Sequence, residues 1–238
     1  TSSRVERACG SGLPRRTLEN TLKPMKRTDA QESLFIGAIL LVAASLIAQE
    51  TNAAWRSKQL TRFKAPEANQ GVAVDEEFFY AIGNREIAKY RKKNGLKAAH
   101  WRDREDGRFI HLNAGVVKDG KLYAAHSNFP KIPMVSSVEV WDVKGLKHID
   151  SHSLGETDGS LAWVDYHEGA WYAGFAHYAK GGGMSGRGPE RTRVVRLDRR
   201  WRIVKEWTFP KELTDRFTPN SCSCAGFGPG GFLYATGH

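Results

Sequence analysis

The stretch GVVKDGKLYAAHS, residues 115–127, contains two apolar runs on either side of the dipeptide Asp119-Gly120. Asp-Gly is a strong signal for a two-residue hairpin turn, because both residues tolerate the positive φ angles that this turn needs. The flanking runs are rich in β-branched and aromatic residues, which favour extended strands. These residues predict an antiparallel β-hairpin.

The order of apolar run, turn and aromatic run recurs in three other parts of the chain. These parts are residues 71–81, 161–174 and 225–235. Each of the first three hairpins is followed by two further strand-like runs, so that one repeat has four antiparallel strands. In the last run of the third repeat, one parity is apolar, which predicts a half-buried strand; its residues are Trp201, Ile203, Trp207 and Phe209.

Repeats of roughly 40–50 residues with four strands are typical of β-propeller blades. A β-sandwich, the alternative, predicts strands of similar density without this recurrence. A helical fold is excluded because no segment after residue 54 sustains a 3.6-residue apolar period. We therefore predict an all-β chain that forms a β-propeller of four-stranded antiparallel blades, present as an incomplete fragment of about 3.5 blades. The predicted blades lie near residues 70–109, 113–154, 160–209 and 224–238.

The first 54 residues differ from the repeats. A basic start at Met25 leads into the apolar run 34–48 and then into small residues at 51–54, which is the layout of a secretory signal peptide. A buried helix or an uncleaved anchor is the alternative. We predict that residues 1–24 are non-native upstream translation, that residues 25–54 are a signal peptide, and that residues 55–238 are a secreted or periplasmic domain. We expect no stable membrane insertion after signal cleavage.

Composition and charge narrow the class of partner. Hydrophobic residues make up 40% of the chain and charged residues 26%, with a formal net charge of +10, which describes a globular, basic protein. The Lys and Arg residues are scattered over predicted strands and turns, and no nucleic-acid motif accompanies them. We expect weak affinity for anions, a small-molecule or glycan ligand, no nucleic-acid partner and a monomer.

Loop lengths distinguish the two faces of the predicted propeller. In an antiparallel meander, the turns after the first and third strands lie on one face, and the loops after the second and fourth strands lie on the other. The first set is short, whereas the second includes residues 126–136, 177–190 and 210–223. Binding sites concentrate on long loops that a rigid scaffold holds. We therefore expect the ligand on this second face, which we call the loop face.

Candidate site residues fall on the loop face. They are His111 and Asn113 near the start of the second blade, Asn84, His126, His177 and His238 at the ends of second strands, and Arg187 and Arg191 in the glycine-rich loop. Imidazole can transfer protons or bind metals near neutral pH, and paired guanidinium groups can clamp a carboxylate. Alternatively, each histidine caps its own strand or joins two blades. The cofactor stays open: none is required, or a divalent metal binds at the channel mouth.

Five strings resemble a known group of propellers. They are HLNAGVV (111–117), LYAAHSN (122–128), MVSSVE (134–139), GSLAWVD (159–165) and FAHY (175–178). They resemble secreted bacterial β-propellers often labelled cycloisomerase, after the carboxymuconate-lactonising propellers of fungi. The resemblance runs from about residue 70 to residue 238. It implies a cofactor-free site in which His126 or His177 is the catalytic acid or base and Arg187 or Arg191 is the clamp for a dicarboxylate.

Two functions stay open at this point, and with them the question whether the chain is an enzyme. The first is an exported propeller that binds a small anionic ligand on a His-rich face, with lactonase- or cycloisomerase-type acid–base activity. The second is a non-catalytic envelope scaffold that binds a protein or a glycan. An enzyme predicts several inward-pointing histidines beside a carboxylate or an arginine. A scaffold predicts histidines that are used in hydrogen bonds between blades.

Overall fold

The computed structural model describes residues 58–179 and 186–237. The predicted upstream segment (1–24), the predicted signal peptide (25–54) and His238 lie outside the described residues. The compact unit that contains the repeats is Leu60–His238. No helix in the described part of the chain has the length and apolar character that crossing a bilayer requires.

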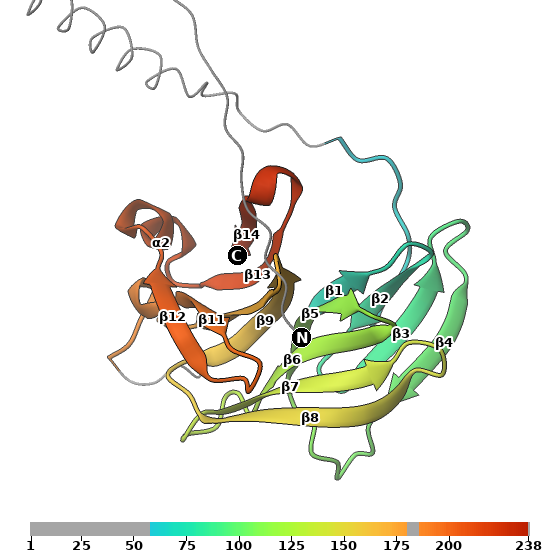
Figure 1. Ribbon diagram of the computed structural model, residues 1–238, viewed down its shortest axis with the longest axis horizontal. Helices are drawn as coiled ribbons and strands as arrows, with labels where there is room; N and C mark the ends of the chain where they lie inside the picture. The colour runs from blue at the N-terminus through green and yellow to red at the C-terminus, as the bar shows by residue number, and fades with distance from the viewer. Residues whose placement is uncertain (1–57, 180–185, 238) are drawn as a thin grey trace, which may run out of the picture. The chain divides into compact units, whose positions relative to one another are not determined.

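The described strands form antiparallel sheets in which each strand pairs with the next one along the chain (Figure 1). Blade 1 contains β1 (Gly71–Val74), β2 (Phe78–Ile82), β3 (Glu86–Arg91) and β4 (Lys97–Arg102). Blade 2 contains β5 (Leu112–Lys118), β6 (Lys121–Ser127), β7 (Val135–Asp142) and β8 (Lys147–Glu156). Blade 3 contains β9 (Ser160–His167), β10 (Ala170–Ala176), β11 (Arg193–Leu197) and β12 (Ile203–Thr208). Blade 4 contributes β13 (Cys222–Phe227) and β14 (Leu233–Gly237).

The first strands of the four blades contact one another in order, β1 with β5, β5 with β9 and β9 with β13. Each blade then extends outward from this inner row (Figure 1). This is the arrangement of a propeller, in which the innermost strands surround a common centre. The prediction of an all-β fold with four-stranded antiparallel blades is confirmed.

Turn chemistry explains why the hairpins close where they do. Asp119 and Gly120, between β5 and β6, have φ angles of 50° and 69°. Glu168 and Gly169 repeat this geometry between β9 and β10, with φ angles of 46° and 80°. Two consecutive residues with positive φ make the type I′ turn, whose twist matches that of the strands it joins.

The hydrophobic core lies between blades, because successive residues of a strand point to opposite neighbours. In the first gap, between blades 1 and 2, Tyr80 and Ile82 of blade 1 pack with Leu122 and Trp141 of blade 2. The second gap lies between blades 2 and 3. It is filled by buried side chains from both blades, namely Ala125, Val138, Leu161, Phe175 and Val195.

Two features of blade 3 differ from the sequence-based expectation. The predicted half-buried outer strand differs from β12, in which every residue is exposed, including Ile203 at 47% and Trp207 at 39%, whereas Phe209, just after the strand, is partly buried. Trp201 precedes the strand and lies in the β11–β12 turn with a φ of 62°. In addition, the loop to blade 4 contains a short helix, α2 (Lys211–Phe217), and short 3₁₀ helices occur at η1 (Pro189–Arg191) and η2 (Pro229–Gly231). The exposure of β12 follows from its place in the blade, because it is the outermost strand and no further strand of the blade covers it.

Candidate functional site

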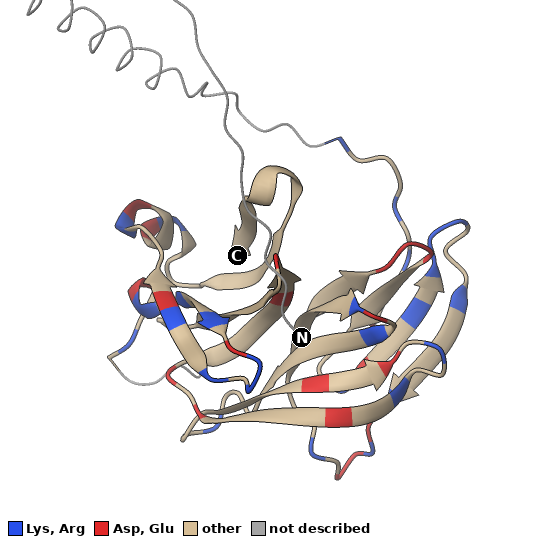
Figure 2. Ribbon diagram, in the orientation of Figure 1, with Lys and Arg blue, Asp and Glu red and all other residues tan. Residues whose placement is uncertain are grey.

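Two clusters of polar side chains contain residues that the sequence predicted for the site. The Glu139 cluster comprises Arg108, His126, Ser137, Glu139, His148 and Ser151. The Asp158 cluster comprises Asp158, His177, Arg187, Arg191 and Arg193. Elsewhere, basic and acidic residues are interspersed along strands and loops (Figure 2).

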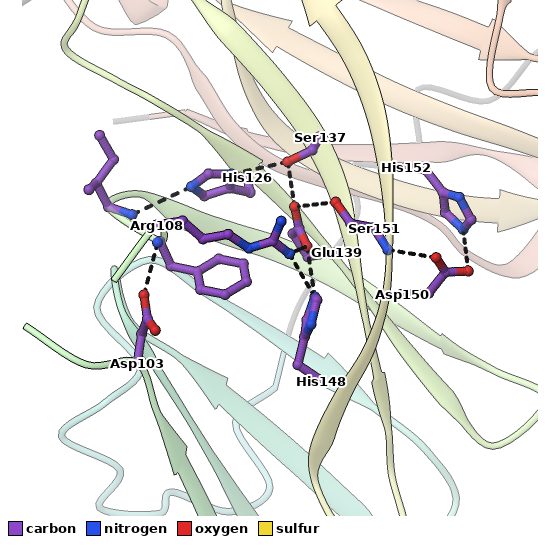
Figure 3. A network of polar contacts seen from close by, with 11 residues as sticks. Asp103, Arg108, His126, Ser137, Glu139, His148, Asp150, Ser151 and His152 are labelled. Carbon is purple, nitrogen blue, oxygen red and sulfur yellow. Dashed lines mark hydrogen bonds and ion pairs between the residues drawn. The ribbon is translucent and has the colours of Figure 1, made fainter. Parts of the chain in front are cut away.

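The Glu139 cluster surrounds a carboxylate that is only 2% exposed. Its oxygens accept hydrogen bonds from Arg108 Nη2 at 2.7 Å, His148 Nε2 at 2.7 Å, Ser137 Oγ at 2.6 Å and Ser151 Oγ at 2.9 Å (Figure 3). The strand register supports this arrangement, because Glu139 on β7 is directly opposite Ser151 on β8. All donors come from blade 2 except Arg108, which lies in the connection from blade 1.

The pKa of Glu139 reflects two opposing effects. Burial acts to raise the pKa of this carboxyl, but hydrogen bonds from His148, Ser137 and Ser151 and the charge of Arg108 outweigh burial and lower the pKa below its usual range. The group is therefore ionised at neutral pH, and its donors satisfy it. A buried, fully hydrogen-bonded carboxylate of this kind ties a blade to the connection that precedes it.

His126, which the sequence predicted as catalytic, belongs to the Glu139 cluster. It pairs with Ser137 across β6 and β7, and its Nδ1 donates to Ser137 Oγ at 3.1 Å. Its Nε2 accepts from the backbone N–H of Ile110 at 3.4 Å. Burial lowers the pKa of His126 to about 4. Both nitrogens of this neutral ring are occupied within the protein.

Three other predicted ligand-binding residues make contacts between blades. His111 Nδ1 lies 2.9 Å from Asn84 Oδ1, which joins the start of blade 2 to the β2–β3 turn of blade 1. Burial lowers the pKa of His111. Asn113 is buried, and its Nδ2 donates to the carbonyl of Leu161 on β9 at 3.2 Å, which joins blade 2 to blade 3. These contacts fit the alternative in which polar groups connect blades.

The Asp158 cluster brings together three of the predicted residues. Asp158 lies in the loop between β8 and β9, and its Oδ1 accepts a hydrogen bond from Arg187 Nη1. Arg191 Nη2 donates to Oδ2 at 3.2 Å, and His177 Nε2 lies 3.4 Å from Oδ1. Burial acts to raise the pKa of Asp158, but the Arg191 hydrogen bond and the charges of His177 and Arg187 lower it overall. The carboxylate therefore stays ionised and holds both arginines.

His177 is 2% exposed and follows directly after β10. Its backbone N–H donates to Thr192 Oγ1 at 3.2 Å, whereas its Nε2 makes no hydrogen bond within the described ranges. Burial lowers the pKa of the imidazole in spite of the nearby Asp158. Gly159 makes room for the ring: a Cβ there would lie 2.8 Å from Nε2, and the φ of 102° favours glycine.

The predicted residues thus divide between clusters that share no hydrogen bond in residues 58–179 and 186–237. His126 joins Glu139, whereas His177, Arg187 and Arg191 join Asp158. His238 lies outside the described residues. Within the described chain, no group of three or more His, Cys, Asp or Glu side chains is arranged to hold a metal ion.

Sequence reasoning missed the two acids at the cluster centres and three basic residues, namely Arg108, His148 and Arg193. A signal for Glu139 was present, since it has the same parity on its strand as Trp141 and so faces the first gap. Arg193 likewise lies on the same face of its strand as Val195 and Leu197, which are buried. Asp158 lies in the loop immediately before Gly159, but nothing in the sequence pairs it with the arginines more than 25 residues later.

Comparison with solved structures supports the propeller class. The chain is similar to glutaminyl cyclase from Myxococcus xanthus, with 14% sequence identity and a TM-score of 0.50 over 70% of this chain and 66% of that chain. Weaker similarity extends to U3-55K (13% identity, TM-score 0.40, 62% of this chain and 41% of that chain). It also extends to a neuraminidase-like protein from A/bat/Guatemala/164/2009 (11% identity, TM-score 0.35, 56% of this chain and 36% of that chain).

No protein-family model and no curated protein sequence matches the chain. The chain spans 66% of the glutaminyl cyclase and less than half of the other two proteins. Similarity at 14% identity shows the fold alone. The chain is therefore a β-propeller, and the finer resemblance to cycloisomerase-labelled propellers stays a prediction.

Proposed function

We propose that the protein is an exported β-propeller that binds a small anionic ligand at the Asp158 cluster on its loop face. The observation that supports this proposal is the meeting of Arg187, Arg191 and the buried His177 at one carboxylate. The two arginines and His177 come from the β10–β11 connection and Asp158 from the β8–β9 loop, and Asp158 contacts both guanidinium groups.

The chemistry of guanidinium fits an anion. The Arg191 guanidinium carries five N–H donors in a planar fork, and its hydrogen bond with Asp158 uses only part of them. The Arg191 side chain is exposed, and that of Arg187 is partly exposed, so both reach solvent while Asp158 orients them. A ligand carboxylate at this place would gain charge-assisted hydrogen bonds from arginines that are already ordered.

In a reaction of the lactonase or cycloisomerase type, His177 is the residue that transfers the proton. In such a step a ligand carboxylate adds to a carbon–carbon double bond and the adjacent carbon takes a proton, and the reverse step returns that proton to the base. His177 is beside the arginines, and its Nε2 makes no hydrogen bond among the described residues. His126 has both nitrogens occupied and lies in the other cluster.

The second candidate, a non-catalytic scaffold, is favoured by a specific observation. His111, His126 and Asn113 are used for contacts within and between blades, as a scaffold predicts. In this alternative the loop face binds a protein or a glycan, and the Asp158 cluster orders the loops.

Ligand titration separates the two candidates. Acetate, succinate and muconate are titrated into the full chain and followed by ligand-observed NMR, with the double variant Arg187→Ala/Arg191→Ala and the charge-matched control Arg196→Ala/Arg199→Ala. We expect at least tenfold weaker binding in the first variant and less than a twofold change in the control. The absence of carboxylate binding, or equal losses in both variants, would overturn the proposal.

Two further measurements address activity and export. NMR of the same muconate samples over hours detects conversion to a lactone, and we expect His177→Gln to abolish any conversion while binding persists. Persistent binding without conversion in the wild type would limit the function to binding. Expression of residues 25–238 in a bacterial host, followed by cell fractionation, tests export, for which we expect periplasmic protein shortened near residue 54.

A further inference from the structure

A cavity of about 340 Å³ lies in the second gap, next to the Asp158 cluster. Its wall contains Asp158 and Arg193, together with the apolar side chains Leu154, Phe175, Trp201 and Ile203. Small-molecule sites have volumes of roughly 300–1,000 Å³ and combine apolar walls with a few polar groups. The cavity has both properties, and Asp158 belongs to its wall as well as to the cluster.

Arg193 is the polar group whose hydrogen bonding is incomplete. Arg193 lies on the same face of β11 as the buried Val195 and Leu197, so its side chain enters the second gap. The side chain is only 20% exposed. Its Nη1 lies 3.6 Å from Glu206 and 4.0 Å from Asp158, which are long contacts for an ion pair. Its Nε is buried and has no hydrogen-bond partner in the described part of the chain. An acceptor beside this guanidinium would complete its hydrogen bonding.

Aromatic and aliphatic side chains line the cavity next to this guanidinium. The Phe175 ring centre lies 5.3 Å from Arg193 Cζ, and Phe175 is fully buried. The left-handed backbone at Trp201 places its indole against His152, with ring centres 4.6 Å apart, and against Trp171, at 4.8 Å. Rings that are held in place from behind provide a rigid apolar surface.

We propose that the cavity binds the apolar or aromatic part of a carboxylate ligand, whose carboxylate accepts a hydrogen bond from the Arg193 guanidinium. This inference rests on the function proposed above and narrows the ligand from small anions in general to aryl and alkyl carboxylates. The ligand carboxylate supplies the acceptor that Arg193 lacks. The ring or chain replaces water against Leu154 and Ile203, which removes their apolar surface from solvent.

Three probes separate the anion from the apolar part of the ligand. Acetate carries the anion alone, benzyl alcohol carries the ring alone, and phenylacetate carries both. Dissociation constants for the full chain are measured by ligand-observed NMR. We expect phenylacetate to bind at least tenfold more tightly than either acetate or benzyl alcohol.

Leu154→Trp tests the cavity directly. Leu154 is a partly buried residue of the outermost strand β8 that packs in the second gap and lines the cavity, so an indole there fills the space without altering Arg187, Arg191 or Asp158. We expect at least fivefold weaker binding of phenylacetate and unchanged binding of acetate. Ile203→Ser removes an exposed apolar side chain from the cavity wall instead of filling the cavity. We again expect weaker binding of phenylacetate and unchanged binding of acetate.

The outcomes are distinguishable from those of the preceding proposal. Equal affinities for acetate and phenylacetate, or equal effects of Leu154→Trp on both ligands, would overturn the cavity proposal while the anion site stands. Binding of phenylacetate that both variants leave unchanged would also overturn it. If no carboxylate binds, the anion site itself is wrong, and the cavity proposal is overturned with it.

Discussion

In the first gap, the buried charge is Glu139, and four donors reach its two oxygens. In the second gap, the buried charge is Arg193, whose Nε has no acceptor within the described ranges and whose nearest carboxylates are 3.6 Å and 4.0 Å away. The packing of the aromatic side chains also differs between the two gaps. Trp141 of the first gap is fully buried, whereas Trp201 of the second gap is partly exposed beside a cavity.

This difference separates a structural polar network from a candidate binding site. A network whose charge is fully hydrogen-bonded stabilises the junction of two blades and has no need of a ligand. A partly paired cation next to a cavity is stabilised further when an anion arrives. The first gap has one unpaired donor of its own, the neutral Trp141 Nε1, which costs less to leave unpaired than a charged group.

The largest expected effect is a difference between two tryptophan variants. Trp141→Ala removes a fully buried side chain, and we expect it to lower the free energy of unfolding by about 3–5 kcal/mol. Trp201→Ala should cost about half as much, because its indole already borders open space. Urea unfolding followed by circular dichroism measures both values. Equal losses would show that the two gaps are packed equally well.

The second prediction concerns the charge of the first gap. Glu139→Leu leaves four donors without their acceptor, and we expect a loss of about 2–3 kcal/mol of unfolding free energy. This loss of unfolding free energy is smaller than is usual for a broken buried ion pair, because Arg108 is 56% exposed and water can solvate it in the variant. Glu139→Gln keeps an acceptor and should lose less. A Leu variant as stable as the wild type would contradict the structural role of the cluster.

The third prediction uses pH. The pKa of His126 is about 4 in the folded state and 6.5 ordinarily, so between these values only the unfolded state takes up the proton. Stability due to this group is therefore full above pH 6.5 and falls as the pH drops toward 4. We expect His126→Asn, which keeps a donor near Ser137, to reduce the loss of unfolding free energy between pH 7 and pH 4.5 by about 2 kcal/mol.

The chosen pH range and the control variant separate the contribution of His126 to the pH dependence from that of other titrating groups. Glu139 has a lowered pKa, so its contribution is present above 4.5 and is lost only at lower pH. His111 and His177 also have lowered pKa values and contribute equally to the wild type and the variant. His100→Asn, on the exposed strand β4, is the matched control. A pH dependence that His126→Asn leaves unchanged would refute the assignment.

The smallest expected effect concerns the charge of the second gap. Arg193→Met removes a cation whose carboxylate contacts are long, and Asp158 keeps its contacts with Arg187 and Arg191, so little ion pairing is lost. We expect the free energy of unfolding to change by less than about 1 kcal/mol, in contrast to Glu139→Leu. Thermal unfolding compares the two variants. A loss above 2 kcal/mol for Arg193→Met would mean that Arg193 is as well satisfied as Glu139, which removes the distinction between the gaps.

The strands and their order were determined by the sequence itself. Short-range signals suffice for this purpose: Asp119-Gly120 specifies its own turn, and alternation of apolar residues marks a strand with two packed faces. Repetition then distinguishes blades from an unrelated set of strands. The same local signals failed at Trp201, because parity cannot show that a residue leaves the strand for a left-handed turn.

Only the tertiary structure decided which polar side chains meet. His126 and His177 occupy equivalent places at the ends of second strands, yet one contacts Ser137 within its blade and the other lies beside Asp158 from the preceding loop. Their partners come from loops and neighbouring strands whose approach depends on blade packing. Hydrogen bonds and ion pairs act over about 3–4 Å, whereas sequence patterns determine only the face on which a side chain lies. The fold was therefore predictable from local chemistry, and the grouping of charges was not.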